Sequence, residues 1–158
     1  MVAGAAGGCV YGFNAGTGFE LDTIAILPFD NSTTRLELTQ EVHEQLLQEL
    51  PRALGLRLAG EEVADAVVSG VIRDYSLRAP NYRAGAQQGD RPQVLQRQVT
   101  LSVSVQVLDV QENLILWESS SLRAEGQYLE ASEDEDVGKR EALEVLVQQI
   151  VDGLQSNW

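Results

Sequence analysis

Residues 96–109 show a strict alternation of apolar and polar side chains, the clearest pattern in the chain. Because successive side chains of a β-strand point to opposite faces, this period of two predicts a strand with one buried and one hydrated face. The buried set is Val99, Leu101, Val103, Val105 and Val107, and the hydrated set is Gln98, Thr100, Ser102, Ser104 and Gln106. A turn over residues 109–113 and a second strand over residues 114–124 predict a β-hairpin.

Two further segments have the period of an amphipathic helix. The first starts at a possible capping box, Thr34 and Glu37, and meets its stop signals at Pro51 and Gly55. Its apolar stripe is Leu38, Val42, Leu46 and Leu50. The second starts at another possible capping box, Ser132 and Glu135, and runs for about 20 residues. Its stripe is Leu143, Leu146, Val147, Ile150, Val151, Leu154 and Trp158.

The remaining segments complete the predicted fold. Residues 23–29 and 64–77 predict strands, residues 56–58 a brief edge strand, and residues 79–93 a long loop. The fold class is therefore α+β, a two-layer sandwich with two helices packed on one face of a mainly antiparallel four-stranded sheet. The other face, rich in Gln, Ser and Thr, stays open to water or to a partner.

Charge narrows the possible partners. The formal net charge of −13 argues against general nucleic-acid binding, which depends on neutralising phosphates. Residues 73–97 oppose this overall sign, with five arginines against two aspartates. Residues 125–136 contain six acidic residues and no basic one, and they predict a solvated loop and helix start. The arginines are Arg73, Arg78, Arg83, Arg91 and Arg97.

Catalytic and metal-binding constellations are missing from the sequence. His43 and Cys9 are the only histidine and the only cysteine, so no zinc site or thiol–base pair can be assembled from them. Nucleophile-elbow and phosphate-loop motifs are also missing. We expect no enzymatic activity, no catalytic residue, no metal and no cofactor.

Cys9 lies in the stretch GGCVYGF, after a tract of small residues. A leftover thiol, a metal ligand, a nucleophile and a lipid attachment site are the four possible roles. A metal ligand and a nucleophile lack companion residues, a disulfide lacks a second cysteine, and Gly7 and Gly8 suit the cleavage side of a lipoprotein signal. We therefore expect residues 1–8 to be the remnant of a signal peptide, residues 9–20 a flexible leader lipid-anchored at Cys9, and residues 21–158 a single domain.

Taken in order, several segments resemble the outer-membrane lipopolysaccharide-assembly lipoprotein family, LptE. They are GCVYGF (8–13), TIAILPFDNSTTRLEL (23–38), EEVADAVVSGVIRDYSL (61–77), QVTLSVSVQVLDVQENLILWESSSLRAEGQY (98–128) and EALEVLVQQIVDGLQSNW (141–158). The specific part is the combination of a Cys-x-Tyr start, a strand running into Pro-Phe-x-Asn, a hairpin ending in Leu-Trp-Glu and a terminal helix ending in Trp.

The resemblance implies a lipoprotein anchored on the periplasmic side of the outer membrane of a Gram-negative cell. There, LptE-like proteins sit inside the β-barrel LptD as a plug, aid its assembly and help it to insert lipopolysaccharide into the outer leaflet. Direct lipopolysaccharide binding is also attributed to the family. For such a contact, or for a contact to the partner, the candidates in this chain are Arg78, Arg83, Arg91 and Arg97, because the guanidinium fork binds phosphate bidentately.

The strand of residues 23–29 followed by a helix leaves a second interpretation open. Periplasmic lipoproteins of the TolB-N-terminal, CsgG or LpoB type share an Ile-Ala-Val-Leu-Pro-Phe-like strand. The chain would then be a secretion-channel subunit or an activator of a cell-wall synthase. The Leu-Trp-Glu hairpin and the Trp-terminated helix favour the LptE family.

Overall fold

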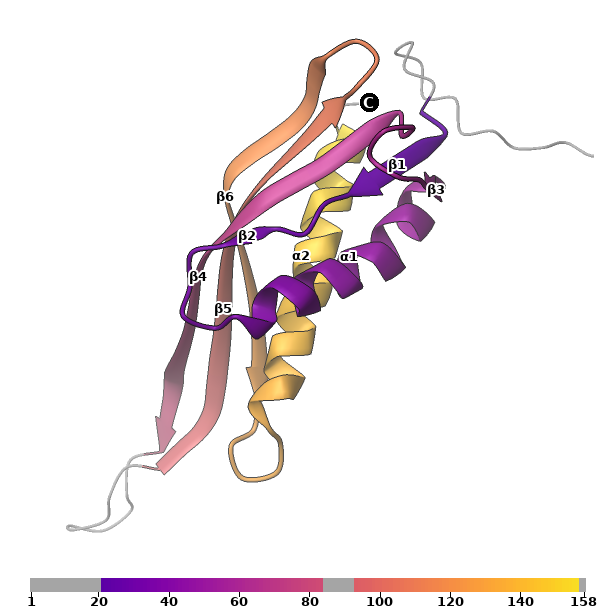
Figure 1. Ribbon diagram of the computed structural model, residues 1–158. Coiled ribbons are helices and arrows are strands. Elements are labelled where there is room, and N and C mark those ends of the chain that lie inside the picture. The colour runs from indigo at the N-terminus through magenta and orange to yellow at the C-terminus, as the bar shows by residue number, and fades with distance from the viewer. Residues whose placement is uncertain (1–20, 84–92, 157–158) are drawn as a thin grey trace, which may run out of the picture.

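The computed structural model describes residues 21–83 and 93–156, which form one sheet with two helices on one of its faces (Figure 1). The elements are β1 (Thr23–Ile26), β2 (Asp30–Asn31), α1 (Glu37–Leu54), β3 (Arg57–Leu58), β4 (Ala66–Arg83), β5 (Gln93–Asp109), β6 (Leu114–Tyr128) and α2 (Glu135–Ser156). The predicted α+β class and the placement of both helices on one face are confirmed.

The sheet has six strands, so the predicted number of four is wrong. The main order is β3-β1-β4-β5-β6, and β2 pairs with β4 outside this path. The long strands β4, β5 and β6 are antiparallel, whereas β1, β2 and β3 are parallel to their neighbours. Pro28 interrupts the first strand, but β4 is long enough for the chain to pair with it again, with Asp30 opposite Val71. This second pairing creates the strand that the sequence did not reveal.

The core lies between the sheet and the helices. All four residues of the α1 stripe are fully buried, and the predicted apolar positions of β5 are at most 2% exposed. The α2 stripe is buried from Leu143 to Leu154, and its predicted last member, Trp158, lies outside the described residues. Both period-based predictions of the core are therefore confirmed within the described residues.

The start of α1 differs from the prediction. The helix begins at Glu37 with Leu36 at the N-cap, where no side chain forms a capping hydrogen bond, so the Thr34–Glu37 capping box is wrong. Pro51 lies inside the last turn and is buried, and Gly55 ends the helix in the left-handed conformation with φ of 69°. The predicted glycine stop is therefore confirmed, because this backbone conformation favours a residue without a Cβ.

The two central strands are longer than the sequence indicated. β4 runs on to Arg83 and β5 starts at Gln93, so both ends of the predicted loop of residues 79–93 are strand. Their pairing continues to Arg83 opposite Gln93, whereas β6 stops at Tyr128, opposite Arg97. Figure 1 shows β4 and β5 running on past the helices. We call residues 78–83 and 93–97 the β4–β5 arm.

Candidate functional site

Three of the four candidate arginines, Arg78, Arg83 and Arg97, belong to the β4–β5 arm at one end of the sheet. Arg78 and Arg97 are part of it, and Arg83 is the last residue of β4. Arg91 and the candidate lipidation site Cys9 lie outside the described residues. The described backbone therefore brings three of the four candidate arginines to the same end of the molecule.

Arg78 and Arg97 nevertheless occupy opposite faces of the sheet. Arg78 pairs with Gln98, which belongs to the polar set of β5, so it lies on the face away from the helices. Arg97 has the parity of the buried valines and lies on the helix side, where its Nη2 and Nε are 2.7 and 3.1 Å from Glu130 Oε1. Arg78 is exposed, and among the described residues no carboxylate lies within ion-pair distance of it. Arg78 is thus the better placed of the two for an external anion.

The sheet face away from the helices, here called the open face, is polar over most of its area. Thr100 has the parity of this face but is only 2% exposed, so the hydrated position predicted there is wrong. Register and parity place on the open face Ser69, Asp74, Ser76, Gln98, Ser102, Ser104, Gln106, Glu118, Arg123 and Glu125. No described helix or strand covers these residues (Figure 1). A face lined by hydroxyls, amides and mixed charges can hydrogen-bond to water or to a polar protein wall.

One end of the open face is apolar. Val67 and Leu108 pair across β4 and β5 and, with Val110, line a shallow hollow of about 510 Å³. Glu61 and Glu62 form its acidic rim. Beside it Ile115 pairs with Leu108 and is 46% exposed. The open face therefore changes from polar at the arm to apolar at the opposite end.

The carboxylate of Asp65 holds the first described residues of the chain at this apolar end. Its Oδ2 accepts hydrogen bonds from the backbone N–H of Asp22 at 3.0 Å and of Thr23 at 2.9 Å, and from Thr23 Oγ1 at 2.9 Å. The backbone hydrogen bond from Asp22, followed by that from the Thr23 hydroxyl, lowers the pKa of Asp65 below its usual value. The first described residues of the chain thus lie at the end of the sheet opposite to the arm.

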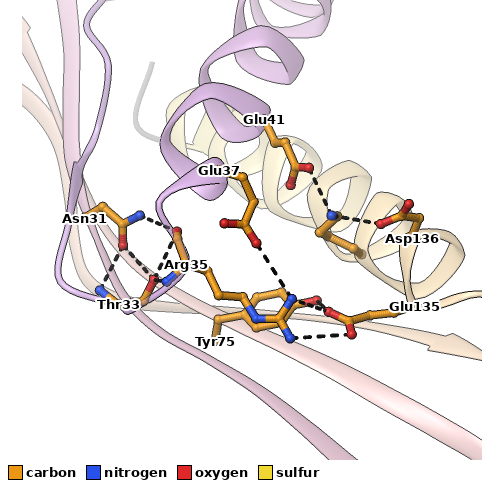
Figure 2. Close-up of polar contacts among 9 residues, drawn as sticks. Asn31, Thr33, Arg35, Glu37, Glu41, Tyr75, Glu135 and Asp136 are labelled. Carbon is orange, nitrogen blue, oxygen red and sulfur yellow. Dashed lines mark hydrogen bonds and ion pairs between the residues drawn. The ribbon is translucent and has the colours of Figure 1, made fainter.

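A polar cluster joins both helix starts to β4 (Figure 2). The guanidinium of Arg35 lies over the Tyr75 ring, 4.6 Å from its centroid, and its Nη1 is 2.7 Å from Glu135 Oε1. The Tyr75 hydroxyl donates to the same carboxylate at 2.6 Å. Burial, and then the hydrogen bond to Glu135, raise the pKa of Tyr75 far above its usual value. Tyr75 therefore stays neutral and donates a hydrogen bond, and the cluster has a structural role: it joins the two helix starts to β4.

Lys139 adds a second set of ion pairs, which connects α2 with α1. Its Nζ lies 3.0 Å from Glu41 Oε1 on α1 and 2.9 Å from Asp136 Oδ1 on its own helix. Desolvation acts to lower the pKa of Lys139, but the hydrogen bonds to Asp136 and Glu41 outweigh it, so the pKa is raised. Lys139 thus stays charged and holds the two helices together.

Replacing Arg35 by alanine should lower the free energy of unfolding by about 1–2 kcal/mol, because the change removes an ion pair and a cation–π contact from one cluster. Chemical denaturation of the purified protein measures this loss. Arg140→Ala, at an exposed position of α2, is the matched control. If Arg35→Ala and the control destabilise equally, the cluster does not join the helices to the sheet.

Sequence reasoning missed this cluster because its members lie 40 to 100 positions apart and no motif connects them. Arg35 stands just before one helix and Glu135 at the start of the other, and only the topology brings these ends together. In the described part of the chain, no group of three or more His, Cys, Asp or Glu side chains is arranged to hold a metal ion. None of the described helices is long and apolar enough to cross a membrane.

Comparison with known proteins decides the family. The sequence matches the LptE family model, described as "Lipopolysaccharide-assembly", over residues 21–154. The chain belongs to the LptE family. Membership places it among the lipopolysaccharide-assembly lipoproteins of the outer membrane, a family that is not enzymatic. The matched residues include nearly all of the sheet and both helices.

Solved structures show the same fold at low sequence identity. The structure of the hypothetical protein CT253 from Chlamydia trachomatis has a TM-score of 0.54 and 14% identity, and the match covers 87% of this chain and 99% of that one. A PelC dodecamer from Paraburkholderia phytofirmans has a TM-score of 0.53 and 15% identity, with 85% and 87% coverage. At these identities the likeness shows a shared fold and nothing further. No curated protein sequence matches the chain at a significant level.

Proposed function

We propose that this LptE-family protein is anchored through Cys9 on the periplasmic side of the outer membrane and binds and plugs an LptD-like β-barrel. In this role it aids assembly of the barrel and the insertion of lipopolysaccharide into the outer leaflet. The family membership supports the pathway. The observation that carries the partner is the open face, which is polar and uncovered and suits the polar interior of a large barrel.

The geometry supports one orientation of the protein inside the barrel. The chain enters the domain at Asp22, whereas the β4–β5 arm lies at the other end of the sheet. From Ala66 to Arg78, β4 alone spans about 40 Å at roughly 3.3 Å per residue. The arm therefore points away from the anchored end, and we propose that it enters the barrel while the apolar end stays at the periplasmic rim.

Affinity purification from native membranes tests the partner. The tagged chain should recover an LptD-like barrel, identified by mass spectrometry. Ser104→Trp puts a bulky side chain on the open face and should lower the recovery at least fivefold, because the interface can no longer close. Gln48→Trp, at an exposed position of α1, is the matched control and should leave the recovery unchanged. Recovery of no such barrel by the unmodified chain would refute the proposal.

The arm offers the contact to phosphate. Arg83→Glu together with Arg91→Glu should weaken lipopolysaccharide binding at least tenfold, because each arginine–phosphate pair contributes about 1.5–3 kcal/mol. Binding of purified lipopolysaccharide, measured by fluorescence anisotropy, reports the change. Arg52→Glu together with Arg140→Glu, at exposed positions of the two helices, is a control with the same charge change outside the arm. Equal binding by the double variant and by the unmodified chain would remove the arm from this role.

The LptE match over residues 21–154 favours lipopolysaccharide assembly over the secretion-channel or cell-wall-synthase alternative. The shared strand of residues 23–29 is compatible with both. The LptE match extends well beyond this strand and also includes the β5–β6 hairpin and most of α2.

A further inference from the structure

The hollow at the apolar end of the open face has a closely packed floor. Val67 is only 8% exposed and packs with Ala25 and Ala64 in a small apolar cluster that is separate from the main core. Leu108 and Val110 extend this apolar surface towards solvent, and Val110 is 42% exposed. The volume of about 510 Å³ falls in the range of sites that hold a small organic ligand, and one or two aromatic side chains are no larger. An apolar group that covers the hollow therefore gains free energy by leaving water.

The first described residues of the chain lie beside this hollow, because both are bound to Asp65. Asp65 Oδ2 accepts the backbone N–H of Asp22 at 3.0 Å, and the Asp65 carbonyl accepts the N–H of Val110 at 2.9 Å. Glu61 and Glu62, which form the rim of the hollow, belong to the turn that leads to Asp65. The segment that precedes Asp22 therefore starts next to the rim.

That segment is the leader, residues 9–20, with the sequence CVYGFNAGTGFE; it lies outside the described residues. Two of the three phenylalanines of the chain, Phe13 and Phe19, belong to it, together with Tyr11. Residues 9–19 carry no charged side chain, so the acidic rim does not repel them. Aromatic side chains bury more apolar area than most others, so the leader has a composition that suits an apolar surface with an acidic rim.

The leader is also long enough to reach the hollow. Phe19 is three residues from Asp22, a distance of about 10 Å in an extended chain, and Phe13 is nine residues away, about 31 Å. A short tether gives an effective concentration of about 1 mM, so a segment with an intrinsic dissociation constant of about 0.1 mM is docked about 90% of the time. A weak contact is therefore sufficient.

We propose that the leader folds back on the domain and places Phe13 and Phe19 in the hollow. This contact needs no barrel, so it holds or fails independently of the proposed function. For a chain anchored at Cys9, docking shortens the free tether from thirteen residues, about 45 Å, to the four residues up to Phe13, about 14 Å. The apolar end of the domain is then held close to the membrane.

Other occupants match the hollow less well. A second copy of the chain would bring its own Glu61 and Glu62 and a net charge of −13 against the same acidic rim. An anionic lipid surface would repel these carboxylates as well. A segment of another protein would have to displace a leader that is tethered beside the hollow.

Chymotrypsin measures the docking, because its specificity pocket takes an apolar side chain and a docked phenylalanine is withheld from it. The full chain with Cys9→Ser, which removes acyl chains as competing occupants, is digested while mass spectrometry follows cleavage after Phe13 and Phe19. Val110→Glu puts a charge into the hollow and should speed this cleavage at least fivefold. Val137→Glu on α2, at a position that is 38% exposed against 42% for Val110, is the matched control and should leave the rate unchanged. Thermal unfolding of each variant shows that the fold is intact.

Nuclear magnetic resonance of the same chain locates the contact without a change in the hollow. The ring protons of Phe13 and Phe19 should show nuclear Overhauser effects to the Val110 methyl groups. Phe13→Ala together with Phe19→Ala should shift these methyl signals, whereas Asn14→Ala together with Thr17→Ala, also in the leader, should not.

Each contrary outcome overturns the proposal. Equal cleavage rates for the Val110→Glu variant and the chain without it would show that the hollow does not hold the leader. Missing effects between the leader rings and the Val110 methyl groups would show the same, even where Val110→Glu fails to fold. Contacts that appear only at high protein concentration would assign the hollow to a second copy. Shifts of the hollow methyl signals that require phosphatidylethanolamine–phosphatidylglycerol vesicles would assign it to the membrane.

Discussion

Gly126→Ala should destabilise the protein by at least about 3 kcal/mol, the largest effect of a single methyl group that we expect. Gly126 lies in β6 directly under α2. A Cβ at this position would lie 1.9 Å from the Gly138 carbonyl oxygen and 2.7 Å from the Ala142 nitrogen. Because both obstacles are backbone atoms of one helix, no side chain can rotate away, and α2 must shift as a whole. The shift would open the buried contacts of α2 with the sheet.

Urea denaturation followed by circular dichroism measures the free energy of unfolding for this variant. Gly60→Ala is the matched control, because nothing lies within 4 Å of the corresponding Cβ. We expect the control to change the free energy of unfolding by less than about 0.5 kcal/mol. A loss below 1 kcal/mol for Gly126→Ala would show that α2 does not pack on the β6 backbone as described.

In cells depleted of the barrel partner, Cys9→Ser should release the protein from the membrane fraction almost completely. Acyl chains contribute about 0.8 kcal/mol for each buried CH₂ group, whereas the described domain has no helix that could cross a membrane. Fractionation of cells that express the chain with its native leader measures the change, and mass spectrometry of the unmodified protein should show acylated Cys9. Val10→Ala, at the neighbouring position, should leave the protein in the membrane fraction. An unmodified Cys9, or a serine variant that stays in the membrane fraction of the depleted cells, would contradict the anchor.

Periodicity predicted those parts of the fold that depend on which side of an element faces the core. The α1 stripe and the alternating valines of β5 are buried as predicted, because the number of residues per turn or per pleat fixes side-chain direction. Of the two-residue strands, β3 was predicted as the edge strand of residues 56–58, whereas β2 was missed, because an element this short carries no periodic signal. Their existence depends on pairing with β1 and β4, which is a property of the assembled sheet.

The sequence predicted which residue types make up the candidate site, but it did not predict on which face of the sheet each of them lies. The excess of arginine in residues 73–97 marked the arm. The helix-side position of Arg97 follows from its parity with Val99, a signal present in the sequence. The placement of Arg78 required the pairing with Gln98, which lies beyond a bulge between Ile72 and Asp74. A bulge changes the register by one residue, so parity within β4 alone does not give the face.

Depletion of the protein in its native host tests the central claim most directly, with lipopolysaccharide at the cell surface as the measured quantity. We expect surface lipopolysaccharide to fall severalfold and newly made lipopolysaccharide to accumulate inside the outer membrane. Expression of the unmodified chain should restore the surface level, and the Ser104→Trp variant should restore it only in part. Surface lipopolysaccharide that stays at its normal level after full depletion would contradict a role in lipopolysaccharide assembly.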